Sequence, residues 1–152
     1  MASLTMDDND LTLRNLTYRL FVELGRAPTI EDVRLKLGWE AEDVRSGWER
    51  LHHEHALVLA TGTPEIRMAN PFSAVPTAHR VRAANRWWYA NCGWDAFGIC
   101  AALHADGDIE TSCPDCGERV EIAVRDQRPD NPGLLFHCLV PAWRWWDDIG
   151  FT

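Results

Sequence analysis

The amino-acid sequence predicts an α+β protein with a helical N-terminal lobe and a small C-terminal lobe of mixed helix and strand. Apolar residues recur at helical spacing between residues 13 and 51, and two short strand-like segments follow them. The segment NPFSAVPTAHR, residues 70–80, is rich in proline and small polar residues, which is typical of a boundary. Beyond it the pattern changes to one buried helix and several strands. We therefore place the two lobes at residues 1–70 and 71–152.

The N-terminal lobe is expected to hold three helices and a hairpin, which together outline a winged helix. Thr29 is a suitable N-cap for the second helix, and Gly25 and Gly38 suit the ends of the first two. Two short strands, residues 56–59 and 66–69, flank the turn-forming sequence TGTPE. The apolar residues at helical spacing are Leu13, Leu16, Leu20, Phe21 and Leu24 in the first helix, Ile30, Val33 and Leu37 in the second, and Val44, Trp48 and Leu51 in the third.

The charge of the chain argues against nucleic-acid binding. A winged helix reads DNA with its third helix, yet residues 40–54 carry two arginines against five acidic residues, a net charge of −3. The whole chain has a net charge of −8, which is unfavourable beside phosphates or an anionic membrane. We therefore favour a structural lobe over a DNA-binding one.

The remaining composition points to a cytoplasmic protein that does not enter a membrane. No apolar run is long enough to span a bilayer, and the acidic start MASLTMDDND is unlike a secretory signal. The chain has five cysteines, an odd number. In a cytoplasmic chain we expect these to be thiols, metal ligands or reactive groups and not a disulfide framework.

The stretch WWYANCGWDAFGIC places a cysteine and an acid on one predicted helix, residues 92–103. Cys92 and Asp95 are three residues apart, so their side chains share a face. With Asn91 as N-cap, Cys92 would lie in the first turn, where free N–H groups and the helix dipole lower the pKa of a thiol. Burial among aromatic rings would raise the pKa of Asp95 and let it carry a proton. The rings expected around it are Trp87, Trp88, Trp94 and Phe97.

The alternative for this pair is a buried cysteine near a capping aspartate, because C-x-x-D alone is a weak signal. The sequence CPDCG, residues 113–117, is a second candidate. Its C-x-x-C spacing is that of a zinc knuckle formed by Cys113 and Cys116. A closed zinc site needs four ligands, and no spacing identifies the others among Cys100, His104, His137 and Cys138. A turn that carries thiols without metal is an equally good interpretation.

Strands are expected at residues 108–111, 119–124 and 134–140, and a Trp-rich helix or turn in the last stretch, PAWRWWDDIGFT. Cys138 falls in the last of these strands. By itself it is best interpreted as a small buried hydrophobic residue.

Four stretches together resemble the alkylmercury lyase (organomercurial lyase) family, in its actinobacterial-style branch. They are NPFSAVPT, WWYANCGWDAFGI, CPDCGE and VPAWRWWDDIGFT, and the resemblance covers residues 70–152. The most specific piece is W-x-x-N-C-x-W-D, which contains Cys92 and Asp95. The resemblance implies a C-terminal lobe of the alkylmercury lyase type, and the winged-helix outline also matches that family's architecture.

The resemblance implies protonolysis of carbon–mercury bonds by two cysteines and an aspartate. Cys92 would be a thiolate ligand of mercury and Asp95 the proton carrier, because soft sulfur binds a soft metal. Mercury enters as substrate and leaves as product, so no organic cofactor is needed and the partner is a small organomercurial or a soft metal ion. Cys113 resembles a family cysteine regarded as structural, so any zinc at the CPDCG turn would be separate from the reaction.

The family's second active cysteine lies in a further strand, which Phe151 would begin, and no cysteine of this sequence occupies that place. Cys138 is the candidate to replace it. We therefore expect either a C-terminally shortened lobe or a member of a branch that has lost full lyase activity. In both cases the chain should capture mercury better than it turns over organomercurials. Two other functions stay open: a non-catalytic thiol protein that binds Hg, Cu or Zn through Cys92, Asp95 and Cys138, and a metal-responsive winged-helix regulator. The acidic third helix counts against the regulator.

Overall fold

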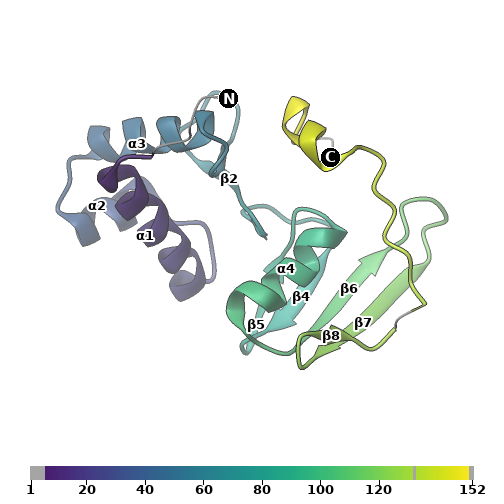
Figure 1. Ribbon diagram of the computed structural model, residues 1–152. Helices are drawn as coiled ribbons and strands as arrows, with labels where there is room; N and C mark the ends of the chain where they lie inside the picture. Colours follow the sequence, from purple (N-terminus) through teal and green to yellow (C-terminus); the bar gives the residue numbers. More distant parts are fainter. Residues whose placement is uncertain (1–5, 132, 151–152) are drawn as a thin grey trace. The chain divides into compact units, whose positions relative to one another are not determined.

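The computed structural model describes residues 6–131 and 133–150. The chain divides into two compact units, Met1–Val75 and Pro76–Thr152, which are described separately (Figure 1). The strand expected to begin at Phe151 lies outside the described residues.

The first unit begins with three helices whose ends follow the capping signals of the sequence. Asp7 caps the first helix by accepting a hydrogen bond from the backbone N–H of Asp10. Thr29 and Asp32 form a capping box at the second, as the sequence predicts for Thr29. Gly25 and Gly38 end the first two helices in the left-handed conformation. The helices are α1 (Asp8–Leu24), α2 (Ile30–Leu37) and α3 (Ala41–His53).

A small antiparallel sheet completes this unit, in the order β1-β2-β3. Its strands are β1 (Val58–Leu59), β2 (Ile66–Ala69) and β3 (Phe72–Ser73). Because β3 pairs with β2, the unit continues past residue 70, where the sequence places the boundary. The core of the helices includes one polar contact, in which the indole N–H of Trp48 donates to the buried hydroxyl of Thr17 at 3.0 Å.

The second unit is built on a five-stranded antiparallel sheet in the order β5-β4-β6-β7-β8. Two-residue turns join β4 to β5 and β7 to β8, and both residues of each turn have positive φ: Ala84 and Asn85, then Asp126 and Gln127. Such turns match the right-handed twist of the strands. The strands are β4 (Arg80–Ala83), β5 (Arg86–Tyr89), β6 (Gly107–Ser112), β7 (Arg119–Arg125) and β8 (Arg128–Pro129).

Helix α4 (Gly93–Leu103) packs on one face of this sheet, against β4 and β6 (Figure 1). Side chains alternate along the strands, so every second residue is buried under the helix. The approach is close at Gly107, where a Cβ atom would lie 2.7 Å from the sulfur of Cys100. The core residues are Val81, Ala83, Trp88, Ile109, Ile122 and Val124 from the strands and Ala96, Ile99 and Cys100 from the helix.

The chain leaves the sheet after β8, and the described residues between Leu134 and Val140 form no strand. The strand expected there is therefore wrong, and on this side the sheet ends with β8, which pairs with β7. A short 3-10 helix, Ala142–Asp147, follows. The indole N–H of Trp145 donates to the carbonyl oxygen of Val140 at 2.7 Å, which ties this helix to the segment.

Among the residues that the structure describes, no helix has the length and apolar character needed to cross a membrane.

Candidate functional site

Cys92 and Asp95 lie at the N-terminus of α4, which begins one residue later than the sequence predicts. The helix begins at Gly93, so Cys92 is itself the N-cap residue and has extended backbone angles. Its carbonyl oxygen accepts the first helical hydrogen bond, from the N–H of Ala96 at 3.1 Å. Asp95 is the third helical residue. The N-cap and third-position side chains of a helix reach toward each other, as they do in a capping box. The C-x-x-D spacing therefore places a thiol and a carboxyl together.

The environment of Cys92 raises the pKa of its thiol, so the expected lowering is wrong. Partial burial is the main cause, because it disfavours the charged thiolate. The backbone N–H groups of Asp95 and Trp94 lower the pKa, as a helix N-terminus should, but they form no full cap hydrogen bond. A negative charge on Asp95 raises it further. At Cys92 the effect of burial on the pKa is therefore larger than the effect of the helix N-terminus.

Asp95 behaves as the sequence predicts, since burial raises the pKa of its carboxyl. The side-chain amide of Asn91 donates to Oδ2 of Asp95 at 3.0 Å and lowers the pKa in part. This hydrogen bond also fixes the orientation of the carboxyl group. A held carboxyl with a raised pKa is suited to general acid catalysis.

The aromatic surroundings differ from the expected wall of tryptophans. Trp88 is a core residue and donates from its indole N–H to the carbonyl oxygen of Ala83. Trp87, its neighbour in β5, points to the opposite face of the sheet, where the Arg80 guanidinium lies 4.3 Å from its ring centroid. Trp94 is on α4 but is 58% exposed. Alternation along β5 explains this result, because adjacent residues of a strand face opposite sides.

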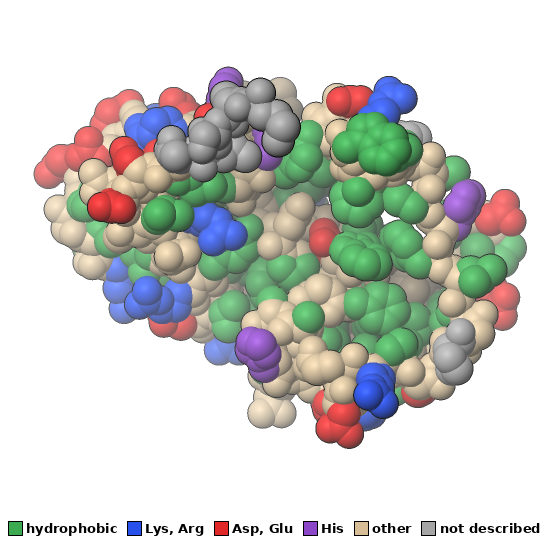
Figure 2. All heavy atoms as spheres, viewed as in Figure 1, with side chains coloured by type: hydrophobic (Ala, Val, Ile, Leu, Met, Phe, Trp, Pro, Cys, Tyr) green, Lys and Arg blue, Asp and Glu red, His purple; other side chains and the backbone are tan. Residues whose placement is uncertain are grey.

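The segment after β8 supplies the cover that the tryptophans do not. The Phe136 ring lies against Gly93, where a Cβ atom would be 3.3 Å from Cε2 of the phenylalanine. Phe136 and Trp94 also form an aromatic pair with ring centroids 5.8 Å apart. Figure 2 shows hydrophobic side chains gathered on the visible face of this unit. The segment itself exposes the apolar side chains of Leu134, Leu135, Phe136 and Leu139.

Cys138 follows two residues after Phe136, which brings a second sulfur toward the N-terminus of α4. Cys138 is exposed, so its interpretation as a buried hydrophobic residue is wrong, and its thiol donates to the carbonyl oxygen of Val140 at 3.0 Å. A charge on Cys138 raises the pKa of Cys92, so the two sulfurs are within electrostatic reach. Among the described residues, however, no three His, Cys, Asp or Glu side chains gather closely enough to hold a metal. Cys92, Asp95 and Cys138 are therefore neighbours and not a closed ligand set.

Cys113 and Cys116 lie in the turn between β6 and β7. The N–H of Cys113 donates to the carbonyl oxygen of Glu118 at 2.8 Å, and the N–H of Gly117 donates to that of Cys113 at 2.9 Å. Backbone N–H groups of Cys116 and Asp115, followed by the thiol of Cys116, hydrogen-bond to the sulfur of Cys113 and lower its pKa. The residues considered as further zinc ligands, Cys100, His104, His137 and Cys138, do not join them in a metal-binding group within the described ranges.

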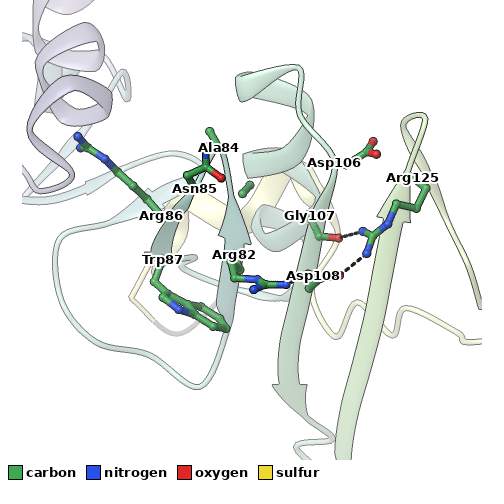
Figure 3. A pocket seen from close by; sticks show the side chains of 10 residues that line it. Arg82, Ala84, Asn85, Arg86, Trp87, Asp106, Gly107, Asp108 and Arg125 are labelled. Carbon is green, nitrogen blue, oxygen red and sulfur yellow. Dashed lines mark hydrogen bonds and ion pairs between the residues drawn. The ribbon is translucent and has the colours of Figure 1, made fainter.

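A hollow of about 510 Å³ lies on the face of the sheet opposite α4 (Figure 3). Three of its charged side chains form ion pairs with one another: Arg82 contacts Asp108 at 2.8 Å and Arg125 contacts Asp108 at 2.6 Å. These two arginines hold the pKa of Asp108 below its usual value, Arg125 having the larger effect. No cysteine lines this hollow. It is therefore not part of the thiol site.

A partly buried thiol beside a carboxyl with a raised pKa brings a soft sulfur ligand and a proton donor together at one helix end. The class of protein follows from the sequence comparison. The family model of the alkylmercury lyases, MerB, matches residues 72–151, just over half of the 152 residues. The chain belongs to the alkylmercury lyase family, which confirms the resemblance seen in its sequence.

A solved structure with a similar fold is "Crystal structure of the mercury-bound form of MerB2". The TM-score is 0.68 with 22% sequence identity, and the match covers 82% of this chain and 60% of that one. The likeness confirms the α+β fold class. The chain thus spans less than two thirds of the MerB2 structure's length. No curated protein sequence matches this chain.

Proposed function

We propose that this protein cleaves carbon–mercury bonds by protonolysis, with Cys92 as the first sulfur ligand and Asp95 as the proton carrier. Family membership supports the reaction class. The observation that carries the assignment of residues is the pairing at the N-terminus of α4. There a carboxyl with a raised pKa, held by Asn91, is the third helical residue after a cysteine at the N-cap.

The raised pKa values of both groups suit a proton relay. At neutral pH Cys92 is a thiol, so mercury binding must displace its proton. Asp95 is positioned to accept that proton, and burial favours the protonated carboxyl. When the carbon–mercury bond breaks, its electron pair stays with carbon, which takes the proton from Asp95. The monothiolate that accompanied the organomercurial leaves when sulfur binds and takes up the proton of the second sulfur ligand. The products are a hydrocarbon, a free monothiol and Hg(II) bound to sulfur, and no oxidation or reduction occurs.

Cys138 is our candidate for the second sulfur ligand. Two thiolates on one mercury weaken its bond to carbon more than one does. The electrostatic reach between Cys138 and Cys92 supports this role, although the two do not form a ligand set in the absence of mercury. The segment that carries Cys138 belongs to no sheet, so no strand pairing opposes a movement of Cys138 toward mercury held by Cys92. We infer that capture by Cys92 precedes this movement and that turnover is the slower process.

The test is incubation with a phenylmercury salt in excess monothiol, with released benzene and protein-bound mercury assayed together. The unaltered chain should release benzene and retain mercury. Cys92→Ser should abolish benzene release. Asp95→Asn should still capture phenylmercury but release benzene about 10²–10⁴ times more slowly, the usual loss for a positioned proton donor. Equal benzene release from the unaltered chain and Cys92→Ser would contradict the proposal.

A non-catalytic thiol protein that stores Hg(II), Cu(I) or Zn(II) is the second candidate. The observation in its favour is that the described residues form no closed two-sulfur site around Asp95. Such a protein would retain mercury in the same assay but release no benzene, and Asp95→Asn would weaken metal retention without affecting any cleavage. Benzene release therefore separates the two functions.

A further inference from the structure

The β6–β7 turn presents two neighbouring thiols that the proposed reaction does not use. We propose that Cys113 and Cys116 form a second metal site, which binds Hg(II) between two thiolates at the surface of the C-terminal unit. The choice of Hg(II) among soft ions rests on the proposed function, whereas the site itself rests on the geometry of the turn.

The backbone holds this turn in one shape. The hydrogen bonds from the Cys113 N–H to Glu118 and from the Gly117 N–H to Cys113 close the turn from both sides. Gly117 has φ +75°, a conformation that residues with a side chain rarely adopt. β6 and β7 pair along their full length up to Ser112 and Arg119 and fix the base of the turn. The two cysteines are therefore positioned before any ion arrives.

The sulfur atoms already meet in this turn. The thiol of Cys116 hydrogen-bonds to the sulfur of Cys113, and the N–H groups of Cys116 and Asp115 point to the same sulfur. Backbone N–H groups directed at one sulfur of a C-x-x-C turn stabilise the metal-binding thiolate form. An ion that replaces the shared hydrogen between the sulfurs would need little rearrangement of the chain.

The ligand number distinguishes Hg(II) from zinc. Structural zinc sites in proteins take four ligands. Within the described part of the chain, no third His, Cys, Asp or Glu side chain completes a group with these two cysteines. Hg(II) is satisfied by two thiolates, and soft sulfur ligands favour soft ions. Cys116 is exposed, so thiols in solution can reach a bound ion and exchange with it.

The binding step is a ligand exchange without oxidation or reduction. Hg(II) arrives as a complex with two small monothiolates. Two sulfur–mercury bonds form to Cys113 and Cys116, two bonds to the monothiolates break, and the two protein thiol protons pass to the departing thiolates. Because both protein ligands belong to one turn, the pair should retain Hg(II) against a large excess of monothiol, whereas either cysteine alone should not.

The experiment uses the full chain with Cys92→Ser and Cys138→Ser, which leaves the turn and the buried Cys100 as its thiols. The protein is mixed with mercuric chloride in excess cysteine and desalted, and bound mercury is measured together with the ultraviolet sulfur-to-mercury absorption. We expect about one equivalent of Hg(II) bound per chain, since one pair of thiols makes one two-coordinate site. Adding Cys113→Ser or Cys116→Ser should reduce bound mercury at least tenfold. Ser112→Ala, a matched control beside the turn, should leave it unchanged.

Retention of mercury after either turn substitution would overturn the proposal, as would a parent protein that retains none. A melting temperature measured for each variant shows that losses do not come from unfolding. Tighter retention of zinc than of mercury, with zinc added alone under the same conditions, would also overturn it. Benzene release by the unaltered chain is measured separately, so a failure of the proposed lyase function and a failure of this site give different results.

Discussion

The hydrogen bond between Asn91 and Asp95 gives one residue control over the acidity of the site. The Asn91 amide lowers the pKa of Asp95 against the raising effect of burial. Asn91→Ala should therefore raise the pKa of Asp95 further and loosen the carboxyl. Carbon-13 NMR titration of the Asp95 carboxyl would measure the shift, and the basic limb of the pH–rate profile should move upward with it. Asn15→Ala, on an exposed position of α1, is the control and should move neither.

The charged form of Asp95 should lower the stability of the folded protein at neutral pH, and replacing Asp95 should therefore raise that stability. A carboxyl whose pKa is raised in the folded state contributes most to stability below its unfolded pKa, about 3.9, and that contribution is lost as pH rises through the folded pKa. Burial disfavours the charged carboxyl. Asp95→Asn should therefore unfold at a higher temperature than the unaltered protein at pH 7. The difference in melting temperature should shrink toward pH 3–4, where the carboxyl is protonated.

Thermal melts across this pH range measure the effect. Asp126→Asn, in the exposed turn between β7 and β8, is the control for loss of one carboxyl and should show no such pH dependence. A lower melting temperature for Asp95→Asn at pH 7 would mean that Asp95 is a structural residue rather than a strained functional one.

At the scale of elements, the site is made where the segment after β8 crosses the N-terminus of α4. Phe136 packs on Gly93 and Trp94 and so contributes to the burial that raises the pKa of Cys92. Phe136→Ala should expose Cys92, lower its pKa and speed its alkylation by iodoacetamide several-fold at neutral pH, because the thiolate is the reactive form. Mass spectrometry of the Cys92 peptide gives the rate at this cysteine alone.

Leu135 offers a matched control for this prediction. It is the preceding residue of the same segment and is 95% exposed, so Leu135→Ala removes apolar atoms that cover little. In Leu135→Ala, Cys92 should be alkylated at the same rate as in the unaltered protein. Equal rates for Phe136→Ala and Leu135→Ala would show that this segment does not control the thiol.

The elements that the sequence predicted well are those whose signals are local. Thr29 and Gly38 bound α2 as expected, because a capping residue and a left-handed glycine act through their own backbone neighbours. The strands near residues 108 and 119 are also found, as β6 and β7. Strands β4 and β5 were not predicted. Their signal is a two-residue turn with a left-handed Asn85 between segments that alternate in burial, which the run of tryptophans obscures.

The placement of Cys92 and Asp95 at a helix start was predictable from the sequence, but the pKa of the thiol was not. The spacing of Cys92 and Asp95 is enough to place them together at a helix start. The raised pKa of Cys92 was not predictable, since its main cause is burial. Part of the cover near this helix end is Phe136, which is distant in sequence and lies in a segment wrongly expected to be a strand. Burial raised the pKa of Cys92 more than the local helix N-terminus lowered it.

At the scale of the whole molecule, the two compact units have separate roles in our interpretation. All five cysteines belong to the unit Pro76–Thr152, and the family match covers residues 72–151. The unit Met1–Val75 contributes no cysteine to metal binding. One of its three helices is the acidic α3. That this unit does not bind DNA specifically therefore stays a prediction.

At the scale of the whole molecule, the role of Cys138 also decides whether the proposed reaction has two sulfur ligands or one. If Cys138 is the second sulfur, Cys138→Ser should lower the rate of benzene release by about 10²–10⁴ while phenylmercury capture by Cys92 continues, since capture needs one thiolate and labilising the carbon bond needs two. Single-turnover measurements separate the two steps.

Leu139→Ala changes the next, exposed residue of the same segment and should leave both steps unchanged. Equal benzene release from Cys138→Ser and the unaltered chain would assign the second ligand to another group. A loss of capture in Cys138→Ser would instead mean that both sulfurs bind mercury from the start, without a movement of the segment after capture.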